Sequence, residues 1–285
     1  MRYPGGVIPT PPTITPPVDG EGGTASGVWT LETQFQNAGV WPKPIIEKQL
    51  WSWGANDQGQ LGLNNNVNRS SPVQVGALTT WSQVASGNFN SIATKTDGTL
   101  WSWGLNNTGQ LGQNNTTNQS SPVQIGALTT WYEVAAGRYH CLSTKTDGTL
   151  WAWGQNNYGT LGQNDTANRS SPVQVGALTT WSQVACGGNS SFAIKTGGTL
   201  WAWGRGLFGG LGLNDVNNRS SPVQVGALTN WSKITGGRFH SVAIKTDGTL
   251  WSWGLNTSGQ LGINNTDYRS SPVQVGALTT WYDVS

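Results

Sequence analysis

A single phrase, LWSWGANDQGQLG, begins at Leu50 and returns in close copies at Leu100, Leu150, Leu200 and Leu250. The spacing is 50 residues each time, without insertion or deletion. Each copy continues into SSPVQVGALT, then a WxxV segment, then a segment that ends in KTDGT or KTGGT. A fixed period of this length is typical of repeated units that bury their apolar faces only by stacking on one another.

Within each copy, alternating apolar and polar residues predict four short strands. In the first copy these are residues 50–54, 72–76, 81–85 and 91–96. Asp97 and Gly98 form an Asp-Gly pair, which favours a two-residue type I′ hairpin. No part of the repeats has helical periodicity. The sequence therefore predicts an all-β fold, a β-propeller of about five four-stranded antiparallel blades.

The residues before the repeats have a different character. Residues 1–27 are rich in Pro and Gly and predict an extended arm. Residues 28–49 predict one short helix, with Thr30 as N-cap and Gly39 as the C-terminal stop, followed by a linker. Trp29, Phe35 and Trp41 make this segment too apolar for a free helix, so we predict that it docks on a partner surface. Residues 50–285 form the predicted propeller.

The consensus LWSWGxNxxGQLG…SPVQV…WxxVxxGxxHSxAxKTDG resembles the regulator of chromosome condensation repeat. The resemblance covers Leu50 to Ser285 and implies a β-propeller. The best-known members of that family have seven blades, whereas this chain carries five WxWG phrases and its last copy stops at WYDVS. We expect a closed five-bladed ring with an imperfect seam, or a closing blade completed by another chain.

Composition excludes several classes of function. Only 10% of the residues are charged and the net charge is +2, which does not indicate a nucleic-acid-binding protein. No segment is apolar enough for membrane insertion, and the N-terminus does not resemble a secretory signal. Cys141 and Cys186 lie at different phases of the repeat, so we expect small buried fillers rather than a disulfide, in a chain made in a reducing cytoplasm.

The five copies separate what every blade needs from what each blade varies. The repeated tryptophans favour burial between blades over a stacking platform for sugars or bases. The variable residues gather in the loop after WxWG and in the loop before the SxAxKT strand, the predicted binding surface. Its candidate residues are Phe89, Asn90, Arg138, Tyr139, His140, Asn189, Arg238, Phe239 and His240. The resemblance implies a structural hydrogen bond for the histidines.

No catalytic constellation is predicted. Two histidines without Cys or carboxylate at ligand spacing do not make a metal site, and no cofactor motif precedes a helix. The acidic residues are few and scattered, so paired-carboxylate hydrolysis is not expected. Arg69, Arg169, Arg219 and Arg269 favour loop-bracing hydrogen bonds over a site for anionic glycans.

We therefore predict a non-enzymatic structural or binding protein. The stretch TASGVWTLETQFQNAGVWP resembles segments of appendage and fibre proteins of marine tailed bacteriophages. This resemblance implies a virion protein, made in the host cytoplasm, whose arm docks on other virion proteins and whose propeller contacts protein or host glycan. The alternative is a cytoplasmic propeller scaffold or exchange-factor-like protein, although the repeats carry no insertion to reach a GTPase. A lectin-like enzyme is disfavoured.

Overall fold

The computed structural model describes residues 48–284. They fall within one compact unit, Glu47–Ser285. The predicted arm and helix, with Trp29, Phe35 and Trp41, lie outside the described residues. Among the described residues, no helix is long and apolar enough to cross a membrane.

The described residues form eighteen short strands and one turn of 3₁₀ helix, η1 (Leu207–Gly209). The strands are β1 (Trp51–Gly54), β2 (Arg69–Gln74), β3 (Trp81–Ser86), β4 (Asn90–Lys95), β5 (Leu100–Gly104), β6 (Gln119–Gln124), β7 (Trp131–Ala136), β8 (His140–Lys145), β9 (Leu150–Gly154), β10 (Arg169–Gln174), β11 (Trp181–Cys186), β12 (Ser190–Lys195), β13 (Leu200–Gly204), β14 (Arg219–Gln224), β15 (Trp231–Gly236), β16 (His240–Lys245), β17 (Leu250–Gly254) and β18 (Arg269–Gln274).

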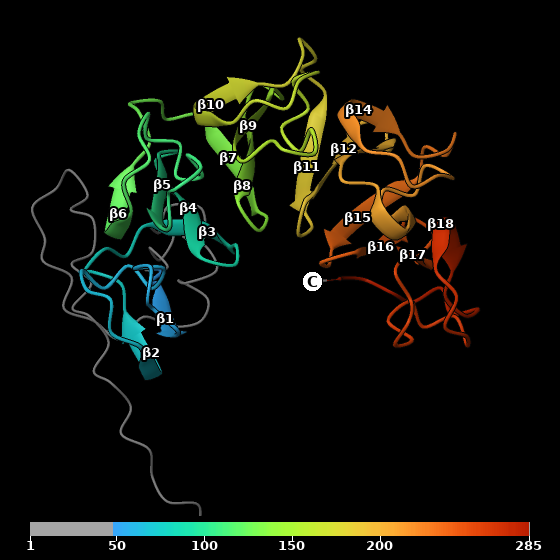
Figure 1. The fold of residues 1–285 in the computed structure, drawn as a ribbon, viewed down its shortest axis with the longest axis horizontal. Helices are drawn as coiled ribbons and strands as arrows, with labels where there is room; N and C mark the ends of the chain where they lie inside the picture. Colours follow the sequence, from blue (N-terminus) through green and yellow to red (C-terminus); the bar gives the residue numbers. More distant parts are fainter. Residues whose placement is uncertain (1–47, 285) are drawn as a thin grey trace, which may run out of the picture. The chain divides into compact units, whose positions relative to one another are not determined.

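These strands pair into five antiparallel sheets, which we call blades 1 to 5 in chain order. Blade 1 is β1–β2, and blades 2 to 5 are the four-stranded sheets β3–β6, β7–β10, β11–β14 and β15–β18. Consecutive blades pack face to face, since β7 contacts β3 and β4 of the blade before it and β11 of the blade after it. Figure 1 shows the blades succeeding one another in chain order. The predicted all-β propeller is confirmed.

Tryptophan builds the core of each blade. In blade 3, Trp131 packs edge-on against Trp151 and Trp153, with ring centroids 5.9 Å and 6.2 Å apart. The Nζ atom of Lys145 lies 3.7 Å from the centroid of the Trp151 ring, a cation–π contact. The same arrangement recurs in blades 2, 4 and 5. The predicted burial is confirmed for the second tryptophan of WxW in blades 2 to 5, whereas the first is only partly buried.

The second tryptophan of each WxWG phrase also joins its blade to the preceding one. Trp153 Nε1 donates a hydrogen bond of 3.1 Å to the carbonyl oxygen of Gln110, in the loop of blade 2. Gly112 lies beneath this indole, and a Cβ there would stand 2.8 Å from Trp153 Nε1. Its φ of +69° also belongs to the left-handed region. Position 112 therefore requires glycine for two reasons: the close approach of the Trp153 ring and the left-handed backbone conformation.

Two local predictions were wrong. The strand predicted over 72–76 is β2, at Arg69–Gln74, because the RSS segment also pairs with the WxWG strand. The Asp-Gly hairpin is not type I′, since only Gly98 has a positive φ. Gly98 N donates to Lys95 O, Lys95 N donates to Thr99 O, and Asp97 Oδ1 accepts the N–H and hydroxyl of Thr99. A wider turn, closed by the aspartate side chain, replaces the two-residue turn.

Blade 1 differs from the others. Among the described residues, β1 pairs only with β2. Trp51 and Trp53 are 48% and 60% exposed, whereas the residues equivalent to Trp53 in blades 2 to 5 are at most 2% exposed. Trp53 has no preceding repeat to supply the carbonyl and glycine that cover its equivalents.

Replacing equivalent tryptophans should therefore have unequal effects. We expect Trp153→Ala to lower the free energy of unfolding by about 3–5 kcal/mol, because it removes a fully buried ring and leaves a cavity. Trp53→Ala should cost less than about 1 kcal/mol, because its ring is mostly in water already. Urea denaturation followed by circular dichroism measures both, and equal losses would contradict this account of the core.

Candidate functional site

The two groups of variable loops lie at the same end of each blade. In an antiparallel sheet the first and third strands run in the same direction, so the loops that follow them leave from one edge. The first group is residues 87–89, 137–139, 187–189 and 237–239. The second is residues 55–68, 105–118, 155–168, 205–218 and 255–268. We call the surface that these loops form the loop face.

Asparagine braces the second group of loops from within. Asn106 is fully buried, its Oδ1 accepts the N–H of Leu111 at 2.9 Å, and its Nδ2 donates to the carbonyls of Asn115 and Thr117. Asn56, Asn156 and Asn256 are buried in the same way. Much of the asparagine in the repeats is therefore structural.

The first group of loops lies side by side in blades 3, 4 and 5. Arg138 N donates to Gly188 O at 3.0 Å, and Gly188 N donates to Gly237 O at 3.1 Å. These backbone bonds place the loops that carry Tyr139, Asn189 and Phe239 side by side. Asn189 is half-buried, and Arg138 and Arg238 directly precede the two aromatic residues. In blade 2, Phe89 stacks on Tyr139 with ring centroids 6.3 Å apart.

Two of the predicted binding residues do not face solvent. Asn90 and His140 are each 1% exposed. Asn90 Nδ2 donates to Cys141 Sγ at 3.3 Å, and His140 Nε2 lies 3.0 Å from the Ser191 hydroxyl of the next blade. The Ser191 hydroxyl donates its proton to Thr160 O, so it accepts a hydrogen bond from His140, whose Nε2 therefore carries a hydrogen. Both residues hold neighbouring blades together.

The two cysteines do not form a disulfide, as expected from their positions in the repeat. Cys141 and Cys186 are free, and Cys141 is fully buried. Burial raises the pKa of Cys141 to about 12, so this thiol stays protonated at neutral pH. Among the described residues, no three His, Cys, Asp or Glu side chains gather as metal ligands.

Blade 4 departs from the pattern of the other blades. Gly206 stands where the other copies carry the buried asparagine, and the loop turns through η1. Phe208 adopts φ +58°, a left-handed conformation that is strained for a large side chain. Its ring lies 5.7 Å from Phe239 and 6.0 Å from Tyr268, centroid to centroid.

Arginine completes this aromatic group. The guanidinium of Arg205 lies 4.6 Å from the centroid of Tyr158 and 5.8 Å from that of Phe239. Arg238, which is exposed, lies 5.0 Å from the centroid of Phe239. We call Tyr158, Arg205, Phe208, Arg238, Phe239 and Tyr268 the arginine–aromatic cluster.

Sequence reasoning selected only part of this cluster. It identified Arg238 and Phe239 but not Arg205 or Phe208. The sequence signal that points to Arg205 and Phe208 is the stretch RGLF (residues 205–208), which departs from the Asn-rich consensus of the other copies. His240, the third predicted residue here, is half-buried, and burial lowers its pKa.

The repeated arginines brace loops, as expected. Arg169 and Arg219 form ion pairs with Asp165 and Asp215, four residues earlier in the chain. Arg69 is held loosely, since its guanidinium reaches Asn65 Oδ1 at 3.5 Å.

The buried histidine predicts a pH dependence of stability. Burial lowers the pKa of His140 from its usual 6.5 to about 4. The folded state therefore favours neutral histidine, and its stability is complete above pH 6.5 and declines as the pH falls toward 4. Below pH 4, the neutral state of His140 no longer contributes about 3 kcal/mol to the free energy of unfolding.

Exchange of His140 for the residue of the equivalent position in blade 2 isolates this effect. The variant His140→Asn copies Asn90 and should lose that part of the acid destabilisation. Glu133, whose pKa burial raises, titrates in both proteins and cancels in the comparison. Urea unfolding at several values of pH measures the difference, and parallel pH profiles would refute it.

Comparison with known proteins agrees with this architecture. The sequence profile of the RCC1-like domain matches residues 46–285. Human WBSCR16 superimposes with a TM-score of 0.71 at 26% identity, covering 81% of this chain and 63% of that one. Yeast RCC1 (Prp20), solved bound to Kap60, superimposes with a TM-score of 0.72 at 20% identity, covering 81% and 58%.

A second structure, of Prp20p from Saccharomyces cerevisiae, gives a TM-score of 0.71 at 21% identity, with 81% of this chain and 60% of that one covered. The chain thus spans about three fifths of the length of these structures. No curated protein sequence matches it. Because the profile covers all the repeats, the chain belongs to the RCC1-like domain family.

Proposed function

We propose that this chain is a protein-binding propeller that recognises its partner through the arginine–aromatic cluster on the loop face. The observation that carries the proposal is the strained Phe208, whose ring packs edge-on against Phe239 and Tyr268. Strain in a loop that departs from the repeat favours a functional origin over a folding one. Arginine and aromatic residues also dominate the energetics of protein interfaces.

The charges of the cluster favour an acidic partner segment. Arg205 and Arg238 lie over aromatic rings and form no ion pair among the described residues. The nearby Asp215 is already neutralised by Arg219. A partner that presents carboxylates beside an aromatic or aliphatic side chain would satisfy both components of the cluster.

Family relatives support the class of function. The yeast structures describe RCC1 (Prp20) bound to Kap60 and the binding of Prp20p to Gsp1p and histones. Those partners belong to those proteins, and here they support only the use of such a propeller as a binding module. A cytoplasmic scaffold or exchange-factor-like role is compatible with this proposal.

Selection from a displayed library of random peptides tests the proposal and does not require that the partner be identified first. The purified chain should enrich peptides that combine acidic and aromatic residues. Phe208→Gly should weaken their binding about tenfold or more, because it removes the ring. It should leave the fold intact, because glycine adopts this backbone conformation without strain.

The double variant Arg205→Ala/Arg238→Ala should bind as weakly as Phe208→Gly, whereas Arg69→Ala in blade 1 should bind like the unmodified chain. Fluorescence polarisation measures all four proteins. Failure to enrich acidic peptides, or equal binding by every variant, would refute the proposed surface.

The virion appendage stays a prediction that rests on the N-terminal segment alone. That segment lies outside the described residues, and the relatives named above do not include a virion protein. Under this hypothesis, residues around Trp29, Phe35 and Trp41 dock on other virion proteins and the loop face meets host protein or glycan. Mass spectrometry of purified particles tests it, and absence of the chain from them would contradict it.

A further inference from the structure

Blade 1 leaves one strand edge and three apolar side chains open. Among the described residues β1 pairs only with β2, whereas its equivalents in blades 2 to 5 also pair, on the other edge, with β4, β8, β12 and β16. Trp51 and Trp53 are 48% and 60% exposed. Val84, in blade 2, is 51% exposed, whereas its equivalents Val184 and Ile234 are 7% and 6% exposed. An open strand edge beside apolar side chains is suited to the addition of a strand.

The complete blades show which side chains fit opposite the two tryptophans. Opposite the first tryptophan of each WxWG phrase lie Ala93, Ser143, Ala193 and Ala243. Opposite the second lie Ser91, Cys141, Ser191 and Ser241. All eight are small, because a large indole leaves little room for its cross-strand neighbour. A strand added to β1 therefore needs two small residues, two positions apart.

The residue between the two small ones is apolar and faces the next blade. It is Ile92, Leu142, Phe192 or Val242 in the four complete sheets. Phe192 of blade 4 belongs to the same buried cluster as Ile234 of blade 5. Because Ile234 is the equivalent of Val84, an apolar residue in the added strand would cover Val84 in the same way.

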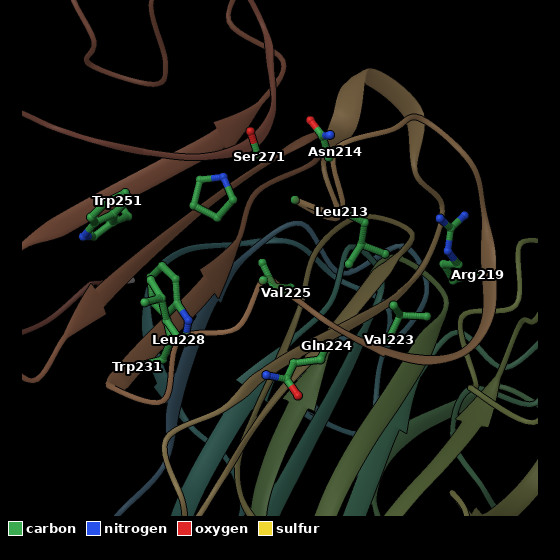
Figure 2. A pocket seen from close by; sticks show the side chains of 13 residues that line it. Leu213, Asn214, Arg219, Val223, Gln224, Val225, Leu228, Trp231, Trp251 and Ser271 are labelled. Atoms are coloured by element: carbon green, nitrogen blue, oxygen red, sulfur yellow. The ribbon is translucent and has the colours of Figure 1, made fainter.

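A lysine follows two positions after the second small residue. Its Nζ atom lies 3.4–3.8 Å from the ring centroid of the first tryptophan of the phrase, in Lys95, Lys145, Lys195 and Lys245. In blade 5, Trp251 also packs edge-on against Trp231, at 6.1 Å between centroids, and both line the cavity drawn in Figure 2. Among the described residues no lysine lies over Trp51, so an added strand that carries lysine would supply this cation–π contact.

The chain does not offer such a strand to blade 1. Lys43 is the only lysine in residues 1–47, and the residue two positions before it is Trp41 rather than a small one. Pro42 and Pro44 flank it and lack the N–H group that a strand donates. A second copy of the chain does not offer one either, since all four of its strands with this pattern are paired within their own blades. These observations favour a partner protein.

We infer that β1 accepts an antiparallel strand from a partner protein with the sequence small–apolar–small–any–lysine. The two small residues lie opposite Trp53 and Trp51, the apolar residue covers Val84, and the lysine lies over the Trp51 ring. Backbone hydrogen bonds to β1 supply affinity and these side chains supply specificity. This surface is separate from the arginine–aromatic cluster, and neither proposal depends on the other.

A fluorescein-labelled peptide that copies residues 239–247, FHSVAIKTD, is the probe, because it carries the required pattern. Fluorescence polarisation with the full chain should show saturable binding. Ala243→Leu in the peptide should weaken binding about tenfold or more, because the larger side chain collides with Trp51. Hydrogen–deuterium exchange at the β1 amides should slow when the peptide is bound, which a contact through side chains alone would not cause.

A double-mutant cycle tests the lysine. Lys245→Gln in the peptide should weaken binding to the unmodified chain about threefold to tenfold, the value of one cation–π contact. The same change should have no effect on binding to Trp51→Ala, which lacks the ring. Tyr132→Ala is the matched control: it removes an aromatic side chain of blade 3 that is 55% exposed, and it should bind the peptide like the unmodified chain.

Four results would each overturn the inference. The first is failure of the peptide to bind, which would follow if residues 1–47 or a second copy already covered β1. The others are equal binding of the Ala243→Leu peptide, unchanged exchange at the β1 amides, and an effect of Lys245→Gln that persists on Trp51→Ala.

Discussion

The hydrogen bond from the second tryptophan of each WxWG phrase to the preceding repeat is the interaction on which this fold depends. It joins Trp103 to Gln60 O, Trp153 to Gln110 O, Trp203 to Thr160 O and Trp253 to Gly210 O, at 2.9–3.1 Å. The indole can reach that carbonyl only over a glycine, and only if the two residues keep one spacing. In every copy the acceptor and this glycine are two residues apart, as in Gln110 and Gly112, so the contact is repeated unchanged along the array.

This hydrogen bond always runs from one blade to the blade before it, which explains why blade 1 differs from the others. Each blade donates to the blade before it, so the first donor, Trp53, has no acceptor from an earlier repeat and is 60% exposed. Cation–π contacts between lysine and tryptophan then stabilise each blade internally, as with Lys245 Nζ, 3.5 Å from the Trp251 centroid. Stability therefore arises both within blades and between them, as expected for stacked repeats.

Because the core occupies nearly every constant position, binding functions are left to the departures from the repeat. Blade 4 holds the clearest one. Gly206 replaces a bracing asparagine and is followed by the strained Phe208, whose ring packs edge-on against Phe239.

The sequence by itself determined the all-β propeller, the number of repeats and, for blades 2 to 5, the burial of the second tryptophan of each WxWG phrase, because a strict period and alternating apolar residues are local signals. It also placed the variable loops together, and Arg238 and Phe239 do lie in the cluster. Only the tertiary structure decided that Asn90 and His140 are buried between blades, since their surroundings come from residues about fifty positions away. For the same reason only the tertiary structure brought Arg205 to Phe239 and left the Trp231 indole unpaired: packing between repeats leaves no trace in the pattern of any one of them.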